Sequence, residues 1–503
     1  MLRVLIAIAL ALPVYELLRW QLLRRAREAL LRKARGYAGR HGVRVDLFKF
    51  GGKQLVREEL LNDRAVTRAM AAAADAGERP TEVLERVERY IDEIVPAFSL
   101  TAYFELGMRL ARAAIGAVYR PVIVVPPPRL PENATAVFLI NHRSNFDYVV
   151  VGWALARQVA ISYAVGEWAR VFPLDALFKA FGGFFVRRGF PDPLYHTVLR
   201  QYLQLITRRG VTQGIFPEGG LTRDGALRPP KVGLLDALLQ LTEECELYFV
   251  PVGINYDRVL EDEVLLAELR GRDRPPTRAE KLRGALRLLL VVPWRTGVNA
   301  LRVAVGRLQR HGYVAVAFGE PLRFRDLPQF RDVARLPDEQ RRARAKEIAA
   351  LLMDRIALCI PATPVALVAR AALDLSCDAS EGEMLARVRE LRERLEAAGV
   401  PLALGREFDP HRKARVELRE DLARTRDLLR LEGDLLAGEE AEEILRLGLE
   451  RLTRRQALAR SAGRIRAGRH PHARDLLAYY ARSLAALERP GIRALEARLV
   501  GTP

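Results

Sequence analysis

Between about residues 134 and 324, short apolar runs alternate with segments of helical pattern. The runs are Ala136–Ile140, Ala160–Ala164, Gly183–Val186, Thr212–Phe216, Tyr248–Ile254 and Val314–Phe318. Each has the length of a buried strand rather than of a helix. Strands that alternate with helices form α/β domains with a mostly parallel sheet and flanking helices. We therefore predict this fold class, with functional residues in the loops beyond the strand ends.

The chain has 503 residues, enough for more than one core at roughly 100–200 residues per domain. We expect four regions: a membrane anchor at 1–36, a helical region at 37–125, the α/β domain at 126–327 and a C-terminal helical region at 328–503. In the last region, charges of both signs follow amphipathic patterns, which is typical of solvated helical faces.

The formal net charge is +19, carried mainly by arginine. A balance this basic implies an anionic partner: nucleic acid, an anionic membrane surface or a phosphorylated substrate. The three cysteines form no C-x-x-C pair. Such a sparse, odd number argues against a disulfide framework or a zinc site and fits a reducing compartment.

The first 40 residues favour attachment to a membrane. The apolar run from Val4 to Tyr15 is shorter than the ~20 residues of a full span. Nine basic and two acidic side chains give residues 1–40 a net charge of +7, with leucines at helical spacing among them. A basic amphipathic helix of this kind binds an anionic leaflet, and its positive charge places the later part of the chain in the cytoplasm. An ordinary buried helix with a solvated basic face remains the alternative.

Polar residues follow the apolar run Ala136–Ile140 abruptly, before a second apolar segment that has the pattern of a helix. His142 lies where the strand should end, and Asp147 lies in or near the first helical turn. Five positions apart across such a turn, the two side chains can meet. A carboxylate that orients an imidazole lets the other ring nitrogen take a proton from an alcohol. Ser144 and Asp147 also fit a capping box, which needs no catalysis.

Two further stretches could bind phosphate. The segment from Gly182 to Gly189 includes the adjacent Arg187 and Arg188, and arginines at a strand end can bind a phosphate. Strand alternation sends the two arginines to opposite faces, so one of them can simply be solvated. Lys231 lies in a proline-rich loop before a helix and is either a second cation for the site or incidental.

The segment Ile215–Arg223 runs from a strand into a tight Pro-Glu-Gly-Gly turn. Glu218 could orient a substrate or hold a loop, and Arg223 could bind phosphate. In the apolar segment Val250–Ile254, Pro251 indicates an edge strand, a bulge or a place where a ligand packs closely. An acyl chain would suit that surface, and so would ordinary core packing.

Several functional classes lack their signals. No G-x-x-x-x-G-K-[ST] loop, no G-x-G-x-x-G after a strand and no His/Cys cluster with metal spacing is present in the sequence. The basic stretches also lack the interleaved aromatic residues of a single-strand nucleic-acid binder. We expect no metal, no resident cofactor and no nucleic-acid partner.

Four blocks in this order resemble the motifs of the glycerolipid acyltransferase superfamily. They are Asn-His-Arg-Ser-Asn-Phe-Asp (first block), Gly-Gly-Phe-Phe-Val-Arg-Arg (second), Phe-Pro-Glu-Gly-Gly-Leu-Thr-Arg (third) and Val-Pro-Val-Gly-Ile (fourth). The chain looks most like the large bacterial sn-glycerol-3-phosphate 1-O-acyltransferases and their dihydroxyacetone-phosphate relatives. The resemblance spans roughly residues 88–324 and, more faintly, the helical tail.

The resemblance implies a role for each matching residue. His142 would deprotonate the hydroxyl of glycerol 3-phosphate, with Asp147 orienting it, and the alkoxide would attack a thioester on CoA or acyl carrier protein. The predicted substrate-binding residues are Arg187, Arg188, Glu218, Gly219, Gly220, Arg223, Lys231 and Pro251. The expected location is the cytoplasmic face of a bacterial inner membrane, with the anionic membrane surface as a partner.

One residue departs from the family pattern. Relatives often have arginine directly after the second small residue of the third block, where this chain has Leu221. The acceptor therefore stays open between glycerol 3-phosphate, lysophosphatidate and dihydroxyacetone phosphate. Two other classes also remain: a catalytically silent membrane scaffold that kept the fold, and a basic nucleic-acid binder.

Overall fold

The computed structural model describes residues 53–489, apart from 97, 99–102, 104–106, 156–157, 167–177, 180, 188, 272–310, 328–330 and 404–428, and a few separate residues between 21 and 48. The predicted membrane anchor at 1–36 lies outside the described residues except for isolated positions. Within the described part of the chain, no helix is both long enough and apolar enough to cross a bilayer.

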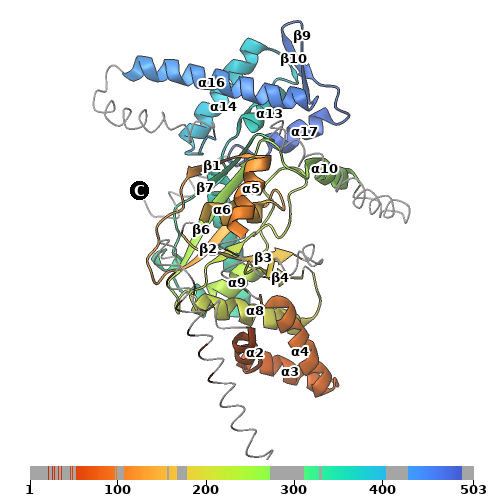
Figure 1. Ribbon diagram of the computed structural model, residues 1–503, viewed down its shortest axis with the longest axis vertical. Coiled ribbons are helices and arrows are strands. Elements are labelled where there is room, and N and C mark those ends of the chain that lie inside the picture. Colours follow the sequence, from red (N-terminus) through yellow and green to blue (C-terminus); the bar gives the residue numbers. More distant parts are fainter. Residues whose placement is uncertain are drawn as a thin grey trace, which may run out of the picture.

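A seven-stranded sheet runs through the middle of the molecule (Figure 1). Its strands are β1 (Arg120–Val125), β2 (Thr135–Ile140), β3 (Ser162–Gly166), β4 (Phe184–Val186), β5 (Gln213–Ile215), β6 (Leu247–Tyr256) and β7 (Tyr313–Phe318). The order is β1-β7-β6-β2-β5-β3-β4, and every described pairing is parallel except that of β6 with β7. Each of the six predicted runs overlaps one strand, so the predicted α/β class with a mostly parallel sheet is confirmed.

The first strand was not predicted. Pro121 in β1 pairs with Val314 of β7, at the edge of the sheet, where a missing N–H is tolerated. The sheet therefore begins before residue 126, and the region 37–125 is helical only up to Val118.

Both faces of the sheet are covered. Along β2, Ala136, Phe138 and Ile140 belong to one apolar cluster, and Val137 and Leu139 belong to another. Helices α5 (Met108–Val118) and α6 (Asp147–Leu155) contribute to the first cluster; α8 (Pro193–Arg208), α9 (Gly233–Leu239) and α12 (Asp338–Cys359) contribute to the second. All six residues of β2 are buried, and so are Asn141 and His142, which follow it, so the carboxyl end of β2 lies in the interior of the domain.

The N-terminal helices α2 (Lys53–Leu61), α3 (Arg64–Asp75) and α4 (Pro80–Ile94) pack against α8 at the lower end in Figure 1. Asp63 caps α3 by accepting hydrogen bonds from the N–H groups of Ala65 and Val66. Asp192 caps α8 and also accepts a 2.6 Å hydrogen bond from the hydroxyl of Tyr90 in α4. These contacts fix the helical region to the second face of the sheet.

Apart from α12, which packs against β6, the labelled elements of the C-terminal region lie at the upper end in Figure 1. Its further elements are α13 (Pro364–Asp374), α14 (Glu381–Ala397), α16 (Leu429–Arg454), α17 (Ala473–Ala481) and a small antiparallel sheet of β8 (Asp378–Ser380), β9 (Leu458–Ser461) and β10 (Arg464–Ala467). That sheet corrects the purely helical expectation for 328–503. Alternation of charge does not reveal a short hairpin.

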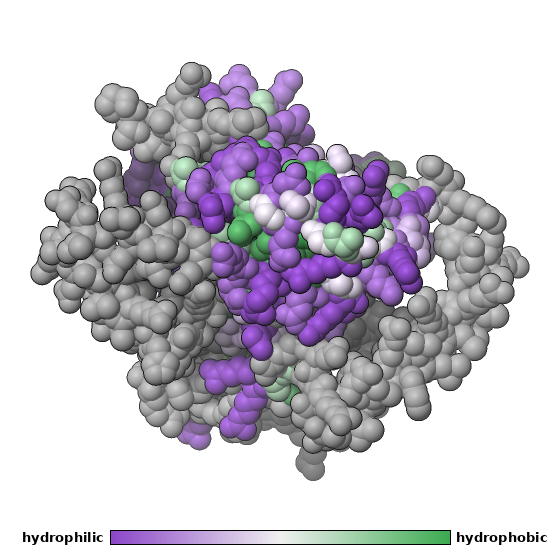
Figure 2. Space-filling model, turned by 90° about the horizontal axis from the view of Figure 1, so that it is seen from above, coloured by the Kyte–Doolittle hydropathy of each residue, from purple (hydrophilic) through white to green (hydrophobic). Residues whose placement is uncertain are grey.

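Buried ion pairs attach this region to the main sheet. Arg451 of α16 pairs with Asp257, directly after β6, and Arg455 pairs with Asp262, the first residue of α10 (Asp262–Arg270). Seen from above, the described part of the C-terminal end is mostly hydrophilic, with a few hydrophobic side chains near its centre (Figure 2). Two short 3-10 helices, Phe324–Asp326 and Val333–Arg335, connect β7 to α12.

Candidate active site

The first block begins with a residue that ties two strands together. Asn141 follows β2 directly, and its side-chain amide donates to the carbonyl of Ile254 at 2.9 Å and accepts from the N–H of Ile254 at 2.7 Å. This double hydrogen bond replaces a ladder bond at the point where β2 ends beside β6. It fixes the position from which the chain turns to His142.

His142 and Asp147 meet as the sequence predicts. Nδ1 of His142 lies 2.9 Å from Oδ2 of Asp147, and both side chains are almost completely buried. A carboxylate can only accept, so Nδ1 carries the hydrogen, and in the neutral form of the ring Nε2 has the lone pair. Among the described residues, Nε2 has no hydrogen-bond partner. The geometry is that of a general base with its orienting carboxylate.

Asp147 is itself held from four directions. Oδ2 accepts from the N–H groups of Arg143 at 2.7 Å and Ser144 at 3.0 Å as well as from the imidazole. Oδ1 accepts a 2.6 Å hydrogen bond from the hydroxyl of Tyr256, at the end of β6. Burial, followed by the charge of Asp147, raises the pKa of Tyr256 well above its usual value, so the phenol remains a donor. The carboxylate is thus fixed before any substrate binds.

The helix-capping interpretation holds in part. Asp147 begins α6, and its carboxylate accepts from the N–H of Ser144, which is one half of a capping box. The other half is absent, because Oγ of Ser144 accepts from Phe146 and donates to Glu261 at 2.7 Å. The same carboxylate therefore serves both the start of the helix and the imidazole.

Aromatic side chains set the plane of the imidazole. Phe216 stacks against it at 4.2 Å between ring centroids, with 33° between the planes. Tyr148 meets it edge-on at 5.6 Å. Such packing leaves the ring few alternative orientations, which keeps Nε2 in one place.

The third block holds the backbone of His142 on both sides. Oε1 of Glu218 accepts the N–H of His142 at 2.7 Å, and the N–H of Thr222 donates to the carbonyl of His142 at 3.0 Å. Oε2 of Glu218 accepts the N–H of Arg228 at 2.9 Å. Burial raises the pKa of Glu218 to about 7, although the two N–H donors oppose this shift. Glu218 therefore holds the backbone at His142, and its predicted role in shaping the acceptor site stays a prediction.

Beside this dyad an apolar pocket opens between α5, α6 and β3. It encloses about 870 Å³ of empty space, including its open mouth. The lining comes from Tyr148, Val149, Gly152 and Trp153 of α6, from residues of α5 between Met108 and Ala114, and from Tyr163, Phe178, Phe181 and Gly183. Because Tyr148 also contacts the imidazole of His142, the pocket leads away from this histidine along α6. Its size and apolar lining suit a hydrocarbon chain.

Comparison with known proteins identifies this part of the chain. Residues 122–255 match the family described as Acyltransferase. This part of the chain resembles an acyltransferase domain. Residues 298–411 match the glycerol-3-phosphate acyltransferase C-terminal region. The matched residues 122–255 include His142, Asp147, the third block and the α6 wall of the apolar pocket, whereas the α5 wall precedes them.

The curated relatives that match are longer proteins. A glycerol-3-phosphate acyltransferase from Aeromonas hydrophila subsp. hydrophila is 29% identical over 308 residues, which cover 58% of this chain and 35% of that protein. One from Ectopseudomonas mendocina (strain ymp) is 30% identical over 353 residues, which cover 66% of this chain and 40% of that protein. This chain thus spans less than half the length of either relative.

A crystal structure of the 1-acyl-sn-glycerophosphate (LPA) acyltransferase, PlsC, from Thermotoga maritima aligns with 65% of this chain and 98% of its own, at 15% identity. The TM-score is 0.27, a likeness too weak to argue from.

The predicted phosphate-binding cations of the acyltransferase domain are not equivalent. Arg187 forms a two-pronged ion pair with Glu93 of α4, at 2.7 and 2.5 Å, and lies over the ring of Phe190. Arg188 lies outside the described residues. Arg223 pairs with Glu268 of α10 at 2.9 Å in an exposed contact. The guanidinium of Arg187 is therefore held by Glu93 of α4, whereas the ion pair between Arg223 and Glu268 is solvent-exposed and weak.

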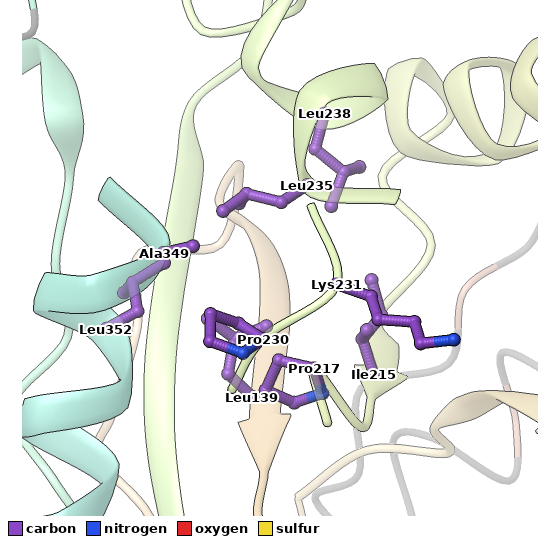
Figure 3. A pocket seen from close by; sticks show the side chains of 9 residues that line it. All are labelled: Leu139, Ile215, Pro217, Pro230, Lys231, Leu235, Leu238, Ala349 and Leu352. Carbon is purple, nitrogen blue, oxygen red and sulfur yellow. The ribbon is translucent and has the colours of Figure 1, made fainter. Parts of the chain in front are cut away.

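Lys231 lies against the third block. Gly219 has a φ of +65°, and a Cβ at this position would lie 2.8 Å from Cδ of Lys231. The lysine stem thus crosses the turn directly over the glycine, and Gly220 beside it is buried. Together with Pro217, Pro230 and others, Lys231 lines a small apolar hollow, and its ammonium points away from the middle of that hollow (Figure 3). Within the described part of the chain, this ammonium forms no ion pair.

Pro251 lies in the interior of the sheet, not at its edge. It pairs with Leu139 of β2, and its carbonyl accepts the N–H of Gly319 at 2.8 Å. Val252 pairs with Phe318, and Phe249 pairs with Leu322. Between these two pairs, the segment after β7 has one residue more than the facing part of β6. Of the readings that the sequence left open, this bulge explains how a proline fits an inner strand. The apolar pocket lining does not include Pro251, so its predicted contact with the acyl chain remains a prediction.

Sequence reasoning missed several residues of the site. Asn141 belongs to the first block, and its position at a strand end could have indicated a bridging amide. Arg143 is buried next to His142, and Nε and Nη2 of its guanidinium have no hydrogen-bond partner among the described residues. Tyr256 and Glu261 contact the first block across more than 100 residues of sequence, and no local pattern announces them.

Arg228 also escaped prediction. Its guanidinium donates to the carbonyl of Leu221 at 3.2 Å, beside the position where relatives often carry arginine. The side chain of Leu221 packs against the apolar cluster of the first sheet face. A guanidinium is therefore present next to Leu221, although it comes from seven residues further along the chain.

Proposed function

We propose that this protein is a glycerol-3-phosphate 1-O-acyltransferase that uses an acyl thioester as donor. The observation that carries the proposal is the buried His142–Asp147 pair at the carboxyl end of β2, with an apolar pocket beside it. The curated relatives named glycerol-3-phosphate acyltransferase and the matching C-terminal region support this choice of acceptor.

The chemical step follows from the dyad. Nε2 of His142 takes the proton of the acceptor hydroxyl, and the oxygen attacks the carbonyl carbon of the thioester. Asp147 stabilises the imidazolium that forms. When the tetrahedral intermediate collapses, the carbon–sulfur bond breaks and the sulfur leaves with the proton that His142 returns. The products are the acyl ester and the free thiol of CoA or acyl carrier protein.

The two substrates approach from different sides in this proposal. The acyl chain enters the pocket along α6, which belongs to the first face of the sheet. The phosphate of the acceptor binds near the third block, where Lys231 offers an ammonium and Arg223 a guanidinium held only by an exposed ion pair. Arg228 supplies a further positive charge next to Leu221.

We also propose that the basic N-terminal segment attaches the protein to the cytoplasmic face of an anionic membrane. Vesicle flotation with and without residues 1–36 tests this. Release from anionic vesicles on truncation is the expected result, and unchanged binding would place the attachment elsewhere.

An acceptor panel tests the main proposal. Purified protein is given radiolabelled palmitoyl-CoA or palmitoyl carrier protein with glycerol 3-phosphate, dihydroxyacetone phosphate or lysophosphatidate. We expect transfer to glycerol 3-phosphate, and a rate lower by about 10²–10⁴ in His142→Ala. No transfer to any of these acceptors, or an unchanged rate in His142→Ala, would refute the mechanism.

A further inference from the structure

The wall of the apolar pocket contains a polar group that acyl transfer does not use. Tyr163 lies in β3 and is 6% exposed. It lines the pocket, and its hydroxyl has no hydrogen-bond partner among the described residues. A buried hydroxyl without a partner costs free energy, and folded proteins rarely tolerate one without a reason.

The phenol of Tyr163 is held in a fixed position. A Cβ at Gly214 of β5 would lie 2.7 Å from Cδ1 of Tyr163, so the ring occupies the space that this glycine leaves empty. Tyr148 packs edge-on against the ring at 5.5 Å, and Phe216 lies parallel to it at 6.4 Å. A polar group held this firmly in an apolar wall is the arrangement by which pockets orient a ligand.

The hydroxyl lies beyond the reacting centre. A Cβ at Gly152 would be 3.6 Å from the hydroxyl oxygen of Tyr163. Gly152 follows Asp147 by five residues in α6, which is roughly 7 Å along a helix axis. The thioester has to react at His142, so the group that meets Tyr163 belongs to the chain beyond the thioester carbonyl.

Burial raises the pKa of Tyr163 well above its usual value, so the hydroxyl keeps its hydrogen at neutral pH. It can therefore both donate to a carbonyl oxygen and exchange hydrogen bonds with an alcohol. An unsubstituted hydrocarbon offers it neither.

We propose that Tyr163 binds an oxygen atom carried on the acyl chain, so that the pocket favours acyl donors with a hydroxyl or keto substituent. This inference rests on the proposed acyltransferase function and names the donor class for the same site. The hydrogen bond contributes to selection between donors and leaves the proton transfer at His142 unchanged.

Donor competition measures the effect. The 503-residue chain is assayed with glycerol 3-phosphate and palmitoyl-CoA, beta-hydroxypalmitoyl-CoA or omega-hydroxypalmitoyl-CoA, and kcat/KM is compared as a ratio to palmitoyl-CoA. We expect at least one hydroxylated donor to be preferred over palmitoyl-CoA, and Tyr163→Phe to reduce that ratio about tenfold. Tyr202→Phe is the control, because Tyr202 is buried in the cluster on the other face of the sheet.

A binding measurement gives a second readout that does not need turnover. Displacement of a fluorescent fatty acid by palmitate and by hydroxypalmitate should show the same preference in wild type and its loss in Tyr163→Phe. If the wild-type protein transfers palmitoyl groups but Tyr163→Phe leaves the donor ratio unchanged, the inference is wrong and the proposed function is unaffected. An equal loss of kcat/KM with every donor in Tyr163→Phe also overturns the inference, because it would mean that Tyr163 acts at the thioester. Absence of palmitoyl transfer in wild type counts against the proposed function and the inference together.

Discussion

The hydroxyl of Tyr256 donates to Oδ1 of Asp147 at 2.6 Å, on the side of the carboxylate opposite His142. Tyr256 and Asp147 are 109 positions apart and meet because β2 and β6 are neighbours in the sheet. Tyr256 is a positioning residue in this arrangement, because it acts on the reaction only through Asp147.

Tyr256→Phe should therefore lower kcat and leave both KM values close to wild type. Hydrogen bonds to charged groups contribute about 1.5–3 kcal/mol, so kcat should fall roughly tenfold to hundredfold. Tyr119→Phe is the matched control, since Tyr119 packs 5.3 Å from Tyr256 but donates to the carbonyl of Arg258. Steady-state kinetics distinguish the two variants, and equal losses would mean that Tyr256 acts only through packing.

Glu218 makes stability depend on pH. Burial raises its pKa from the ordinary 4.5 to about 7, so the folded state binds the proton more tightly than the unfolded chain. Its contribution to stability is fully present below pH 4.5 and is lost as pH rises through 7. The free energy of unfolding should fall across this window by on the order of 3 kcal/mol from this group.

Glu218→Gln removes that proton exchange and should flatten the slope between pH 4.5 and 7. Thermal unfolding of wild type and variant across this range measures the difference, which cancels the contributions of other groups. Glu390→Gln changes an exposed carboxylate of α14 and should keep the wild-type slope. If Glu218→Gln also keeps the wild-type slope, then the pKa of the Glu218 carboxyl is the same in the folded and the unfolded chain, and the prediction is wrong.

The fold and the dyad could be read from the sequence for local reasons. Apolar runs such as Ala136–Ile140 carry their own strand signal, and the spacing between His142 and Asp147 is short enough for one turn to join them. The first strand escaped notice because Pro121 and the prolines after Val125 are typical of a connection. Only the partner strand β7, nearly 200 residues later, makes Arg120–Val125 part of the sheet.

The site's supporting contacts depend on residues distant in the sequence. Two adjacent arginines after a strand suggested a phosphate site, yet Arg187 finds Glu93, 94 positions earlier, when α4 packs beside β4. Likewise Glu261 binds the turn at Ser144 only after α10 has taken its place. Local spacing contains no information about such partners, and the fold supplies it.

The ion pair between Arg187 and Glu93 predicts a structural role for this arginine. Arg187→Ala removes the ion pair from the nearly buried carboxylate of Glu93 and should lower the free energy of unfolding by about 2 kcal/mol. The double variant Arg187→Ala/Glu93→Gln should recover part of this loss.

Lys231→Ala should behave in the opposite way, with unchanged stability and a KM for glycerol 3-phosphate raised about tenfold.

Thermal unfolding and acceptor kinetics on the same three proteins separate these roles. A raised acceptor KM in Arg187→Ala without loss of stability would return Arg187 to the phosphate site.

Gly225 lies two residues after the third block and contacts the C-terminal region. It has a φ of +83°, and a Cβ there would overlap the carbonyl oxygen of Tyr479 in α17. Gly225→Ala should therefore destabilise the protein by about 3 kcal/mol, from backbone strain and the forced movement of α17. Gly463→Ala is the control, since Gly463 has a φ of +73° and a Cβ there would meet nothing within 4 Å. Unfolding midpoints that fall equally would show that strain alone is responsible.

Gly152 should limit the length of the acyl chain. It lies in the wall of the apolar pocket, on the side of α6 that faces Tyr163. A leucine at this position would fill the space beyond the reacting centre, so Gly152→Leu should reduce kcat/KM for palmitoyl-CoA at least tenfold and retain most activity with octanoyl-CoA. Gly116→Leu places the same side chain on α5 at a position outside the pocket lining, with nothing within 4 Å, and should keep the wild-type chain-length profile. A profile of unsubstituted donors measures both variants, and an equal loss with short and long chains would mean that the acyl chain lies elsewhere.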